Sequence, residues 1–169
     1  MTTTPEQHKA DAHETIRCAV ITVSDTRTME TDTGGAEVVR FLEEAGHEVG
    51  EREIIPDEPS QMQSLLEWLR DNHQVDAILM TGGTGISHRD QTFETVTSLL
   101  TKPLPGYGEL FRMLSYDEIG AAAMLSRATG GLMERTLLLT MPGSRAAVRL
   151  AMEKIILPEL NHLVREARR

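Results

Sequence analysis

The amino-acid sequence predicts an α/β fold, with a largely parallel sheet that carries helices on both faces. Short apolar segments typical of buried strands alternate along the chain with segments in which apolar residues recur at helical spacing. Parallel strands require crossover connections, usually helices, so this alternation favours a parallel sheet. A length of 169 residues suits one domain. We expect residues 15–169 to form that domain and the polar residues 1–14 to be a flexible tail.

The first part of the chain supplies two strands, each followed by a helix. Residues 17–23 are β-branched and apolar, which predicts a strand buried on both faces. A loop with two adjacent glycines leads to a helix that ends at Gly46, a residue suited to a helix C-terminus. Residues 48–55 predict a second, more polar strand. Pro59 suits the first turn of the next helix, whose apolar residues are Met62, Leu65, Leu66 and Leu69.

The middle of the chain is less regular. Residues 75–80 predict a third buried strand, and a weaker helical pattern follows at residues 92–100. Prolines and glycines at residues 102–108 predict an irregular connection. A Ser-x-x-Glu capping box at residues 115–118 predicts the start of a helix that continues through Leu125.

The last part of the chain returns to the alternating pattern. Residues 136–141 predict another buried strand. Ser144 can cap the helix that follows it. Leu157-Pro158 interrupts the helical pattern, so we expect a separate final helix at residues 159–169.

Composition and charge exclude several classes of function. The formal net charge of −9 argues against nonspecific binding to nucleic acid or to a membrane surface. No apolar run approaches the roughly 20 residues of a membrane span. The first residues lack the apolar segment of a secretory signal, and a single cysteine, Cys18, agrees with a reducing compartment. We therefore expect a cytoplasmic protein in which Cys18 is buried and inert.

The most distinctive local feature is the glycine-rich stretch that follows the third strand. Gly82, Gly83 and Gly85 let the backbone turn and approach a ligand closely, which suits a phosphate-binding loop. The stretch is not a Walker A loop, because Ile86 and Ser87 follow Gly85 where Lys and Ser or Thr are required. It also lacks the third glycine of a dinucleotide fingerprint, since His88 stands there. A tight strand-to-helix turn without a ligand is the alternative.

The other unusual loops are also expected at the carboxyl ends of strands. Ligands of parallel α/β sheets bind outside these ends, so loops that follow parallel strands share one rim. Substrate-binding residues are therefore expected in the loops after the four strands. The residues that we expect there are Ser24, Asp25, Asp57, Gly82, Gly83, Thr84, Gly85, Ser87, Arg89, Asp90, Pro142, Gly143 and Ser144.

The carboxylates of this rim have two compatible interpretations. Asp57 or Glu58 could cap the helix that begins at Pro59, and Asp90 could cap the helix after Gln91, because aspartate is a favoured N-cap residue. Alternatively, an acidic protein that handles phosphates is expected to recruit Mg²⁺ through such carboxylates. Arg89 could contact a phosphate, or it could lie in a solvated loop.

Several of these motifs occur together in one protein family. The segments are Val23-Ser24-Asp25, Ile55-Pro56-Asp57-Glu58, Thr81 to Gly85 with Arg89-Asp90, and Met141-Pro142-Gly143-Ser144. With them, the chain resembles the MoaB/MogA family of molybdenum cofactor biosynthesis proteins over roughly residues 17–158. The segments 106–112 and 125–128 also look like this family. Pro-Gly-Ser at residues 142–144 is more similar to the MoaB branch.

The resemblance implies a fold, an activity and an assembly. The family fold is a three-layer α/β/α sandwich with a mixed sheet, and its members are trimers or hexamers. The implied reaction joins molybdopterin and ATP to give adenylylated molybdopterin and pyrophosphate, with Mg²⁺ as cofactor. The implied partners are molybdopterin, ATP, further copies of the chain and other molybdenum cofactor assembly proteins.

The resemblance also suggests roles for the rim residues. We expect Asp57 and Asp90 to be catalytic and to hold Mg²⁺, and the amides of residues 82–85 to bind phosphate. Ser24, Asp25 and Ser144 are expected to contact molybdopterin or adenine. Some MoaB-type members lack the first of these aspartates and are thought not to catalyse, so a carrier or scaffold that binds molybdopterin is the alternative. A third alternative is a domain that serves another phosphorylated metabolite.

Overall fold

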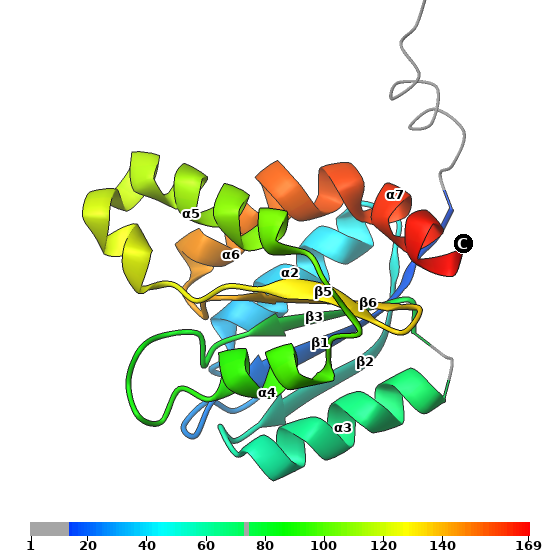
Figure 1. The fold of residues 1–169 in the computed structure, drawn as a ribbon, viewed down its shortest axis with the longest axis horizontal. Coiled ribbons are helices and arrows are strands. Elements are labelled where there is room, and N and C mark those ends of the chain that lie inside the picture. Colours follow the sequence, from blue (N-terminus) through cyan, green and yellow to red (C-terminus); the bar gives the residue numbers. More distant parts are fainter. Residues whose placement is uncertain (1–13, 73–74) are drawn as a thin grey trace, which may run out of the picture.

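The computed structural model describes residues 14–72 and 75–169, and it has the three-layer α/β/α architecture (Figure 1). The predicted tail, residues 1–14, lies outside the described residues except for Glu14. The strands are β1 (Arg17–Val23), β2 (Glu48–Ile55), β3 (Ala77–Thr81), β4 (Lys102–Pro103), β5 (Gly130–Met133) and β6 (Thr136–Met141). The α-helices are α2 (Thr33–Glu44), α3 (Pro59–Asp71), α4 (Thr92–Leu99), α5 (Pro105–Ile119), α6 (Arg145–Ala151) and α7 (Leu157–Arg168).

The sheet is mixed, in the order β2-β1-β3-β6-β5-β4. Strands β1, β2, β3 and β6 are parallel to one another, and β5 pairs antiparallel with both β6 and β4. The parallel strands are those whose loops the sequence analysis expects to meet. The antiparallel pairs lie at one edge, so they do not interrupt the rim formed by the parallel strands.

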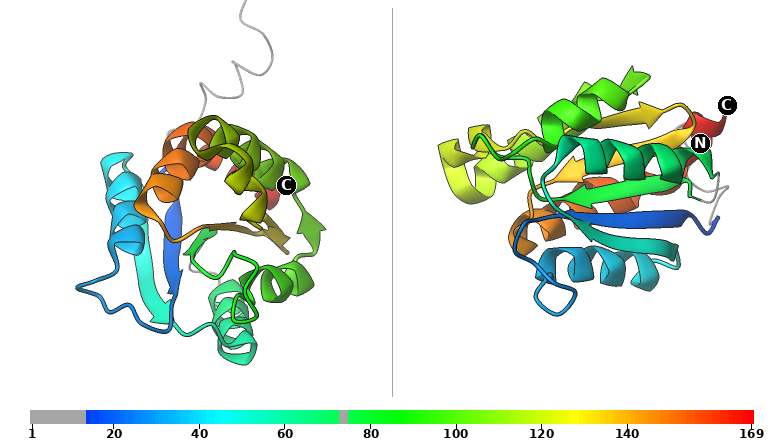
Figure 2. Two further views of the ribbon diagram at one scale, coloured as in Figure 1. Left: turned by 90° about the vertical axis from the view of Figure 1, so that its left-hand side faces the viewer. Right: turned by 90° about the horizontal axis from the view of Figure 1, so that it is seen from below.

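Two hydrophobic cores lie on opposite faces of the sheet because successive strand side chains alternate in direction. Cys18 and Val20 of β1 belong to the core covered by α2, α5, α6 and α7. Ala19 and Ile21 belong to the core covered by α3 and α4. Figure 2 shows the two helical layers on either side of the strands. Strands β1, β3 and β6 are thus buried on both faces, as their apolar sequences predict, whereas the more polar edge strand β2 is only partly buried.

The region between α4 and β6 differs most from the sequence-based expectations. The segment expected to be irregular contains strand β4 and the first turns of α5, which begins at Pro105. Ser115 does not open a helix: it lies inside α5, where its hydroxyl donates to the Phe111 carbonyl at 2.8 Å. Helix α5 ends at Ile119, Gly120 follows with a φ of 65°, and a 3-10 helix runs from Gly120 to Leu125. A Ser-x-x-Glu pattern therefore occurs here without its capping role.

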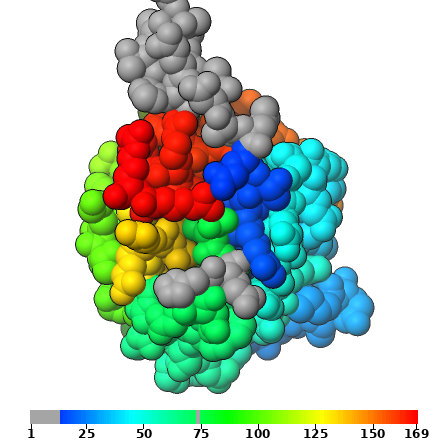
Figure 3. Space-filling view, turned by 90° about the vertical axis from the view of Figure 1, so that its right-hand side faces the viewer, coloured from blue at the N-terminus to red at the C-terminus, as the bar shows by residue number. Residues whose placement is uncertain are grey.

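The end of the chain is also more continuous than expected. A π-helical turn, Met152–Ile156, joins α6 to α7, and Pro158 lies in the first turn of α7. Proline has no N–H to donate, so Pro158 cannot form a regular helical hydrogen bond, and the π-helical turn lies directly before it. Glu14 is tied to α7, since its carbonyl accepts from Asn161 at 2.6 Å and its carboxylate from Arg168 at 2.8 Å. Figure 3 shows α7 beside the start of β1 at this end of the molecule.

The single thiol gives a simple test of the core. Cys18 is fully buried, and burial raises the pKa of its thiol to about 12. We expect Cys18 to resist alkylation by iodoacetamide at pH 8 while the protein is folded, because the thiolate is the reactive form. Mass spectrometry of the native and the urea-unfolded protein measures this, with labelling expected only after unfolding. Rapid labelling of the native protein would contradict the packing of β1.

Candidate functional site

The loops after β1, β2, β3 and β6 lie side by side at one edge of the molecule, the left edge in Figure 1. Main-chain hydrogen bonds extend one residue beyond the strands: Ser24 N donates to Ile55 O at 2.9 Å, and Gly82 N donates to Met141 O at 3.0 Å. The loops therefore leave the sheet in register. The predicted shared rim is confirmed as an arrangement of the chain.

The glycine loop after β3 depends on main-chain conformations that favour glycine. Gly82 has a φ of 92° and Gly83 a φ of 65°. A Cβ atom at Gly82 would collide with the Val23 carbonyl oxygen. A Cβ atom at Gly83 would lie 2.6 Å from Asp57 Oδ2, and one at Gly85 would lie 2.7 Å from Asp90 Oδ2. The two aspartates thus lie directly against this loop.

Asp57 is buried, with 5% of its surface exposed. It does not cap α3, because Glu58 occupies the N-cap position and no side chain makes the capping bond. Instead, Asp57 Oδ1 accepts from Gln91 N at 3.1 Å, just before α4. Burial raises the pKa of the Asp57 carboxyl, and the nearby charges of Asp90 and Asp25 add to this effect. Asp57 is therefore a buried acid near other acids.

Asp90 closes a turn in the glycine loop. Its Oδ2 accepts from Ser87 N at 2.9 Å, and its own N–H donates to Ser87 O at 3.0 Å. The N-cap residue of α4 is Gln91, without a side-chain capping bond. The capping interpretation is therefore wrong for both aspartates. Both carboxylates lie beside the glycine loop on the side of α3 and α4.

Arg89 connects three loops of the rim. Its guanidinium donates to both carboxylate oxygens of Asp25, at 2.7 and 2.9 Å, and to Glu58 Oε1 at 2.6 Å. The bond from Arg89 lowers the pKa of the Asp25 carboxyl to about 2. Asp25 Oδ1 also accepts from Asp57 N at 3.2 Å. Contact of Arg89 with substrate stays a prediction, and in this structure its charge is balanced by carboxylates.

Arg127 supports the glycine loop from the other side, and the sequence analysis did not single it out as a site residue. Its N–H donates to Thr84 O at 2.8 Å. Its guanidinium donates to Gly85 O at 2.7 Å and to Asp90 O at 2.9 Å, and it also contacts Glu94. The signal in the sequence was the family-like segment 125–128, which does not indicate a contact made across the fold.

The remaining predicted residues line a cavity of about 330 Å³ on the α2 and α6 side of the rim. The wall of the cavity includes Ser24, Gly82, Gly143 and Ser144. Pro142 directly precedes Gly143 in the loop after β6. Ser144 caps α6 as predicted, since its Oγ accepts from Ala147 N at 3.2 Å.

Asp32, which the sequence places on the rim with Gly34 and Gly35 but without a role, lines this cavity. It is 3% exposed. Its carboxylate accepts from Gly35 N at 2.9 Å, from the Thr22 hydroxyl at 2.8 Å and from Arg52 at 3.2 Å. Asp32 thereby joins β1, β2 and the start of α2. Its position two residues before a pair of glycines was the available signal.

A second cavity, of about 290 Å³, lies far from these loops. It is bounded by Leu132, Leu137 and Leu163, between the β4–β5 edge and α7. Its lining is largely aliphatic, and it contains none of the predicted site residues. The convergence of polar loops therefore identifies the rim as the candidate site.

The chemistry of the rim suits Mg²⁺ held jointly with phosphate. Within residues 14–72 and 75–169, no group of three or more His, Cys, Asp or Glu residues could hold a metal ion alone. Mg²⁺ usually binds one or two protein carboxylates and completes its shell with water and substrate phosphates. Asp57 and Asp90 could serve as such a pair, because both carboxylates lie against the glycine loop.

Comparison with known proteins agrees with this architecture. Residues 19–162 match the family model described as a probable molybdopterin binding domain. Molybdenum cofactor biosynthesis protein B of Bacillus subtilis is 54% identical over 166 residues, which cover 97% of each chain. The chain belongs to the MoaB/MogA family. A crystal structure of molybdenum cofactor biosynthesis protein B superposes with a TM-score of 0.90 at 49% identity, covering 94% of this chain and 99% of the other.

Within the MoaB/MogA family, the chain is closer to MoaB. A solved structure of MogA has a TM-score of 0.82 but only 26% identity, over 89% of this chain and 99% of that one. The Pro-Gly-Ser sequence after β6 had indicated the same branch. None of the helices that the structure describes is both long enough and apolar enough to cross a bilayer.

Replacing Asp57 with Asn tests the electrostatic cost of its burial. Because the pKa is raised in the folded protein, protonation of Asp57 favours folding below its ordinary value of 3.8, and this contribution is lost as the pH rises through the raised pKa. Near neutral pH the carboxylate therefore destabilises the fold, whereas Asn keeps the acceptor for Gln91. We expect the melting temperature of Asp57→Asn to rise by about 2–4 °C, as about 1 kcal/mol produces in a chain of this size.

Differential scanning calorimetry measures this difference. Glu43→Gln, which removes one negative charge from the exposed surface of α2, is the matched control and should leave the melting temperature nearly unchanged. Added Mg²⁺ should raise the melting temperature of the wild type more than that of Asp57→Asn. A variant that melts below the wild type would show that the carboxylate stabilises the fold.

Proposed function

We propose that this protein acts in molybdenum cofactor biosynthesis by transferring an adenylyl group from Mg²⁺-ATP to molybdopterin. The observation that carries the proposal is the pair Asp57 and Asp90, which lie against Gly83 and Gly85 of the loop after β3. The matched family is described as a probable molybdopterin binding domain, and the relatives named above act in cofactor biosynthesis by name. These findings support the pathway, and the rim geometry supports the reaction.

The reaction mainly requires that the two substrates be positioned and that their phosphate charges be neutralised. A terminal phosphate oxygen of molybdopterin attacks the α-phosphorus of ATP, a new P–O bond forms, and the bond from the α-phosphorus to the β-phosphate oxygen breaks to release pyrophosphate. The attacking group is already an anion, so no strong general base is required. Alignment of the two substrates and stabilisation of the leaving charge therefore dominate catalysis.

The rim residues supply these two requirements. Asp57 and Asp90 would hold Mg²⁺, which supplies screening of the phosphate charges when bound. Arg127 keeps the main chain of the glycine loop in place through the carbonyl groups of Thr84 and Gly85. The Gly82 N–H is already donated to Met141 O, so the N–H groups of residues 83–85 are the ones proposed to bind phosphate. Ser24, Asp25 and Ser144 are proposed to contact the pterin or the adenine. Asp57 is fixed by Gln91 and contacts Asp25 through its own N–H, so it is held in place before substrate binds.

The test is direct synthesis of the product. Purified protein, freshly prepared molybdopterin and Mg²⁺-ATP should give adenylylated molybdopterin, detected by mass, together with pyrophosphate. Asp57→Asn and Asp90→Asn should each lower kcat by about 100-fold at limiting Mg²⁺, because each removes one carboxylate that would hold the cation. Glu43→Gln is the control and should turn over normally.

The possible results of this experiment separate two classes of function. Normal turnover by both aspartate variants would refute the metal site. No product from the wild type, with molybdopterin still bound, would favour a carrier or scaffold that does not catalyse. A wild type that binds neither molybdopterin nor ATP would favour a domain for another phosphorylated metabolite. The single buried thiol is consistent with the cytoplasmic location that we propose for this function.

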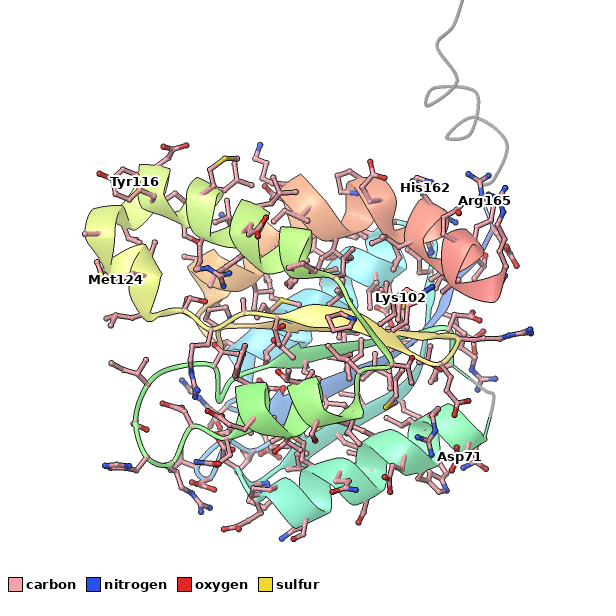
Figure 4. All side chains as sticks on the ribbon, viewed as in Figure 1. Asp71, Lys102, Tyr116, Met124, His162 and Arg165 are labelled. Atoms are coloured by element: carbon pink, nitrogen blue, oxygen red, sulfur yellow. The ribbon has the colours of Figure 1, made fainter. Side chains whose placement is uncertain are left out.

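We further propose that the protein works as a homo-oligomer, a trimer or a hexamer. Helix α5 buries Tyr107 and Phe111 against the sheet, yet the opposite side of α5 and the 3-10 helix after it are also apolar. The exposed residues there are Leu110, Met113, Tyr116, Ile119, Met124 and Leu125. Figure 4 labels Tyr116 and Met124, which project at one end of the molecule. Large apolar side chains gathered on an exposed surface are typical of a contact between proteins.

Charged substitutions on α5 test the assembly. Met113→Glu combined with Tyr116→Glu should convert the oligomer to a species near the chain mass of 18.8 kDa, because two carboxylates would be buried without partners. Size-exclusion chromatography with light scattering measures the mass. Trp68→Glu, on exposed α3, is the control and should keep the wild-type mass. A monomeric wild type would refute the oligomer and leave another assembly protein as the partner of this face.

A further inference from the structure

The sheet divides the rim into two halves of different character. On the side of α3 and α4, Asp25, Asp57, Glu58 and Asp90 lie around one arginine, Arg89. On the side of α2 and α6 lies the cavity of about 330 Å³, whose charged lining residues are Arg27 and Asp32. The halves meet at the glycine loop, where Gly82 lines the cavity and Gly83 lies against Asp57.

The cavity carries an excess of positive charge. Asp32 is balanced by Arg52 at 3.2 Å, and its oxygens also accept from Thr22 and Gly35. Arg27 has no carboxylate partner within residues 14–72 and 75–169; its Nη1 donates to the Thr31 carbonyl at 3.0 Å. An arginine has five N–H donors, so most of those of Arg27 have no protein acceptor in the described part of the chain.

The loop that carries Arg27 is ordered by its own hydrogen bonds. Ser24 Oγ accepts from the N–H groups of Thr26 and Arg27 at 3.2 and 3.1 Å. Thr28 N donates to Thr31 Oγ1 at 2.8 Å, and Asp32 N donates to Thr28 O at 2.8 Å. Arg27 is therefore held at the mouth of the cavity by a defined loop.

The outer surface beyond Ser144 is balanced in charge. Arg145 and Arg149 of α6 share the buried carboxylate of Glu37 with Arg40 of α2, at N–O distances of 2.9 to 3.5 Å. Arg40 also pairs with Glu44, and Arg149 with Glu153, so three carboxylates face these three arginines. The excess positive charge at the cavity therefore comes from Arg27 and not from this surface.

We propose that Arg27 binds a phosphate group of a substrate in this cavity, without a metal ion, across the glycine loop from Asp57 and Asp90. This inference rests on the proposed function, in which two anionic substrates must approach each other. Guanidinium groups suit phosphate because they donate two parallel hydrogen bonds to it. The acidic half would take the phosphates that arrive with Mg²⁺, and Arg27 would take the phosphate that arrives without it.

Binding of inorganic pyrophosphate tests the site independently of turnover. In calorimetric titrations at low ionic strength without Mg²⁺, we expect Arg27→Ala to bind pyrophosphate at least about tenfold more weakly than the wild type. Arg27→Lys should lie between them, because it keeps the charge without the paired donors. Arg135→Ala, which removes the same charge from the exposed turn between β5 and β6, should bind like the wild type. Equal affinity for the wild type and Arg27→Ala, or no binding by the wild type, would overturn the proposal.

Kinetics then identify which substrate supplies the phosphate. A raised KM for molybdopterin with an unchanged KM for ATP in Arg27→Ala would assign the terminal phosphate of the pterin, and the reverse would assign the nucleotide. Unchanged values of both would overturn the role of Arg27. A wild type without adenylyl transfer would refute the proposed function alone, because the pyrophosphate titration still decides whether Arg27 binds phosphate.

Discussion

The candidate site depends on one close approach between main chains. Gly82 passes so near the Val23 carbonyl that a single additional carbon would separate β1 from the loop after β3. The same passage brings Gly83 against Asp57 and leaves Gly82 in the wall of the neighbouring cavity. The positions of both halves of the rim therefore depend on Gly82 and Gly83, and the parallel strands set the distance between the loops.

The sequence predicted the parts of the molecule that follow from periodicity and strand direction. The apolar segments that contain Val20 and Leu79 predicted strands buried on both faces of a sheet. The order of the strands predicted that the loops after them share one rim. The sequence-based prediction was wrong where tertiary contacts override local sequence patterns. Ser115 has the spacing of a capping box, yet Tyr107 and Phe111 pack one continuous helix through it. Strand β5, with two glycines, has no strand-like pattern and is defined by its pairing with β6.

The same distinction applies to the site. Asp57 and Asp90 could be selected from the sequence because each is an aspartate expected at the carboxyl end of a strand, beside the glycine loop. The burial of Asp57 and the effect of Asp90 on its pKa could not be predicted. The roles of Arg127 and Asp32 could not be predicted, because their partners lie far away in the chain or accept through carbonyl groups. Hydrogen bonds to main-chain atoms leave no residue-type signal at the accepting position. The sequence therefore predicts residues whose type suits the proposed chemistry. The residues that support them are recognised only in the folded structure.

The attachment of the glycine loop has a consequence for substitutions within it. Arg127 grips the carbonyl groups of Gly85 and Asp90, so it fixes the two ends of the segment between them through atoms that every residue possesses. Ile86 within that segment is 68% exposed and contributes no side chain to the core. The shape of the segment therefore depends on Arg127 and the glycines rather than on the side chain of Ile86. Substitution of Ile86 should change the surface of the loop without disturbing the sheet below.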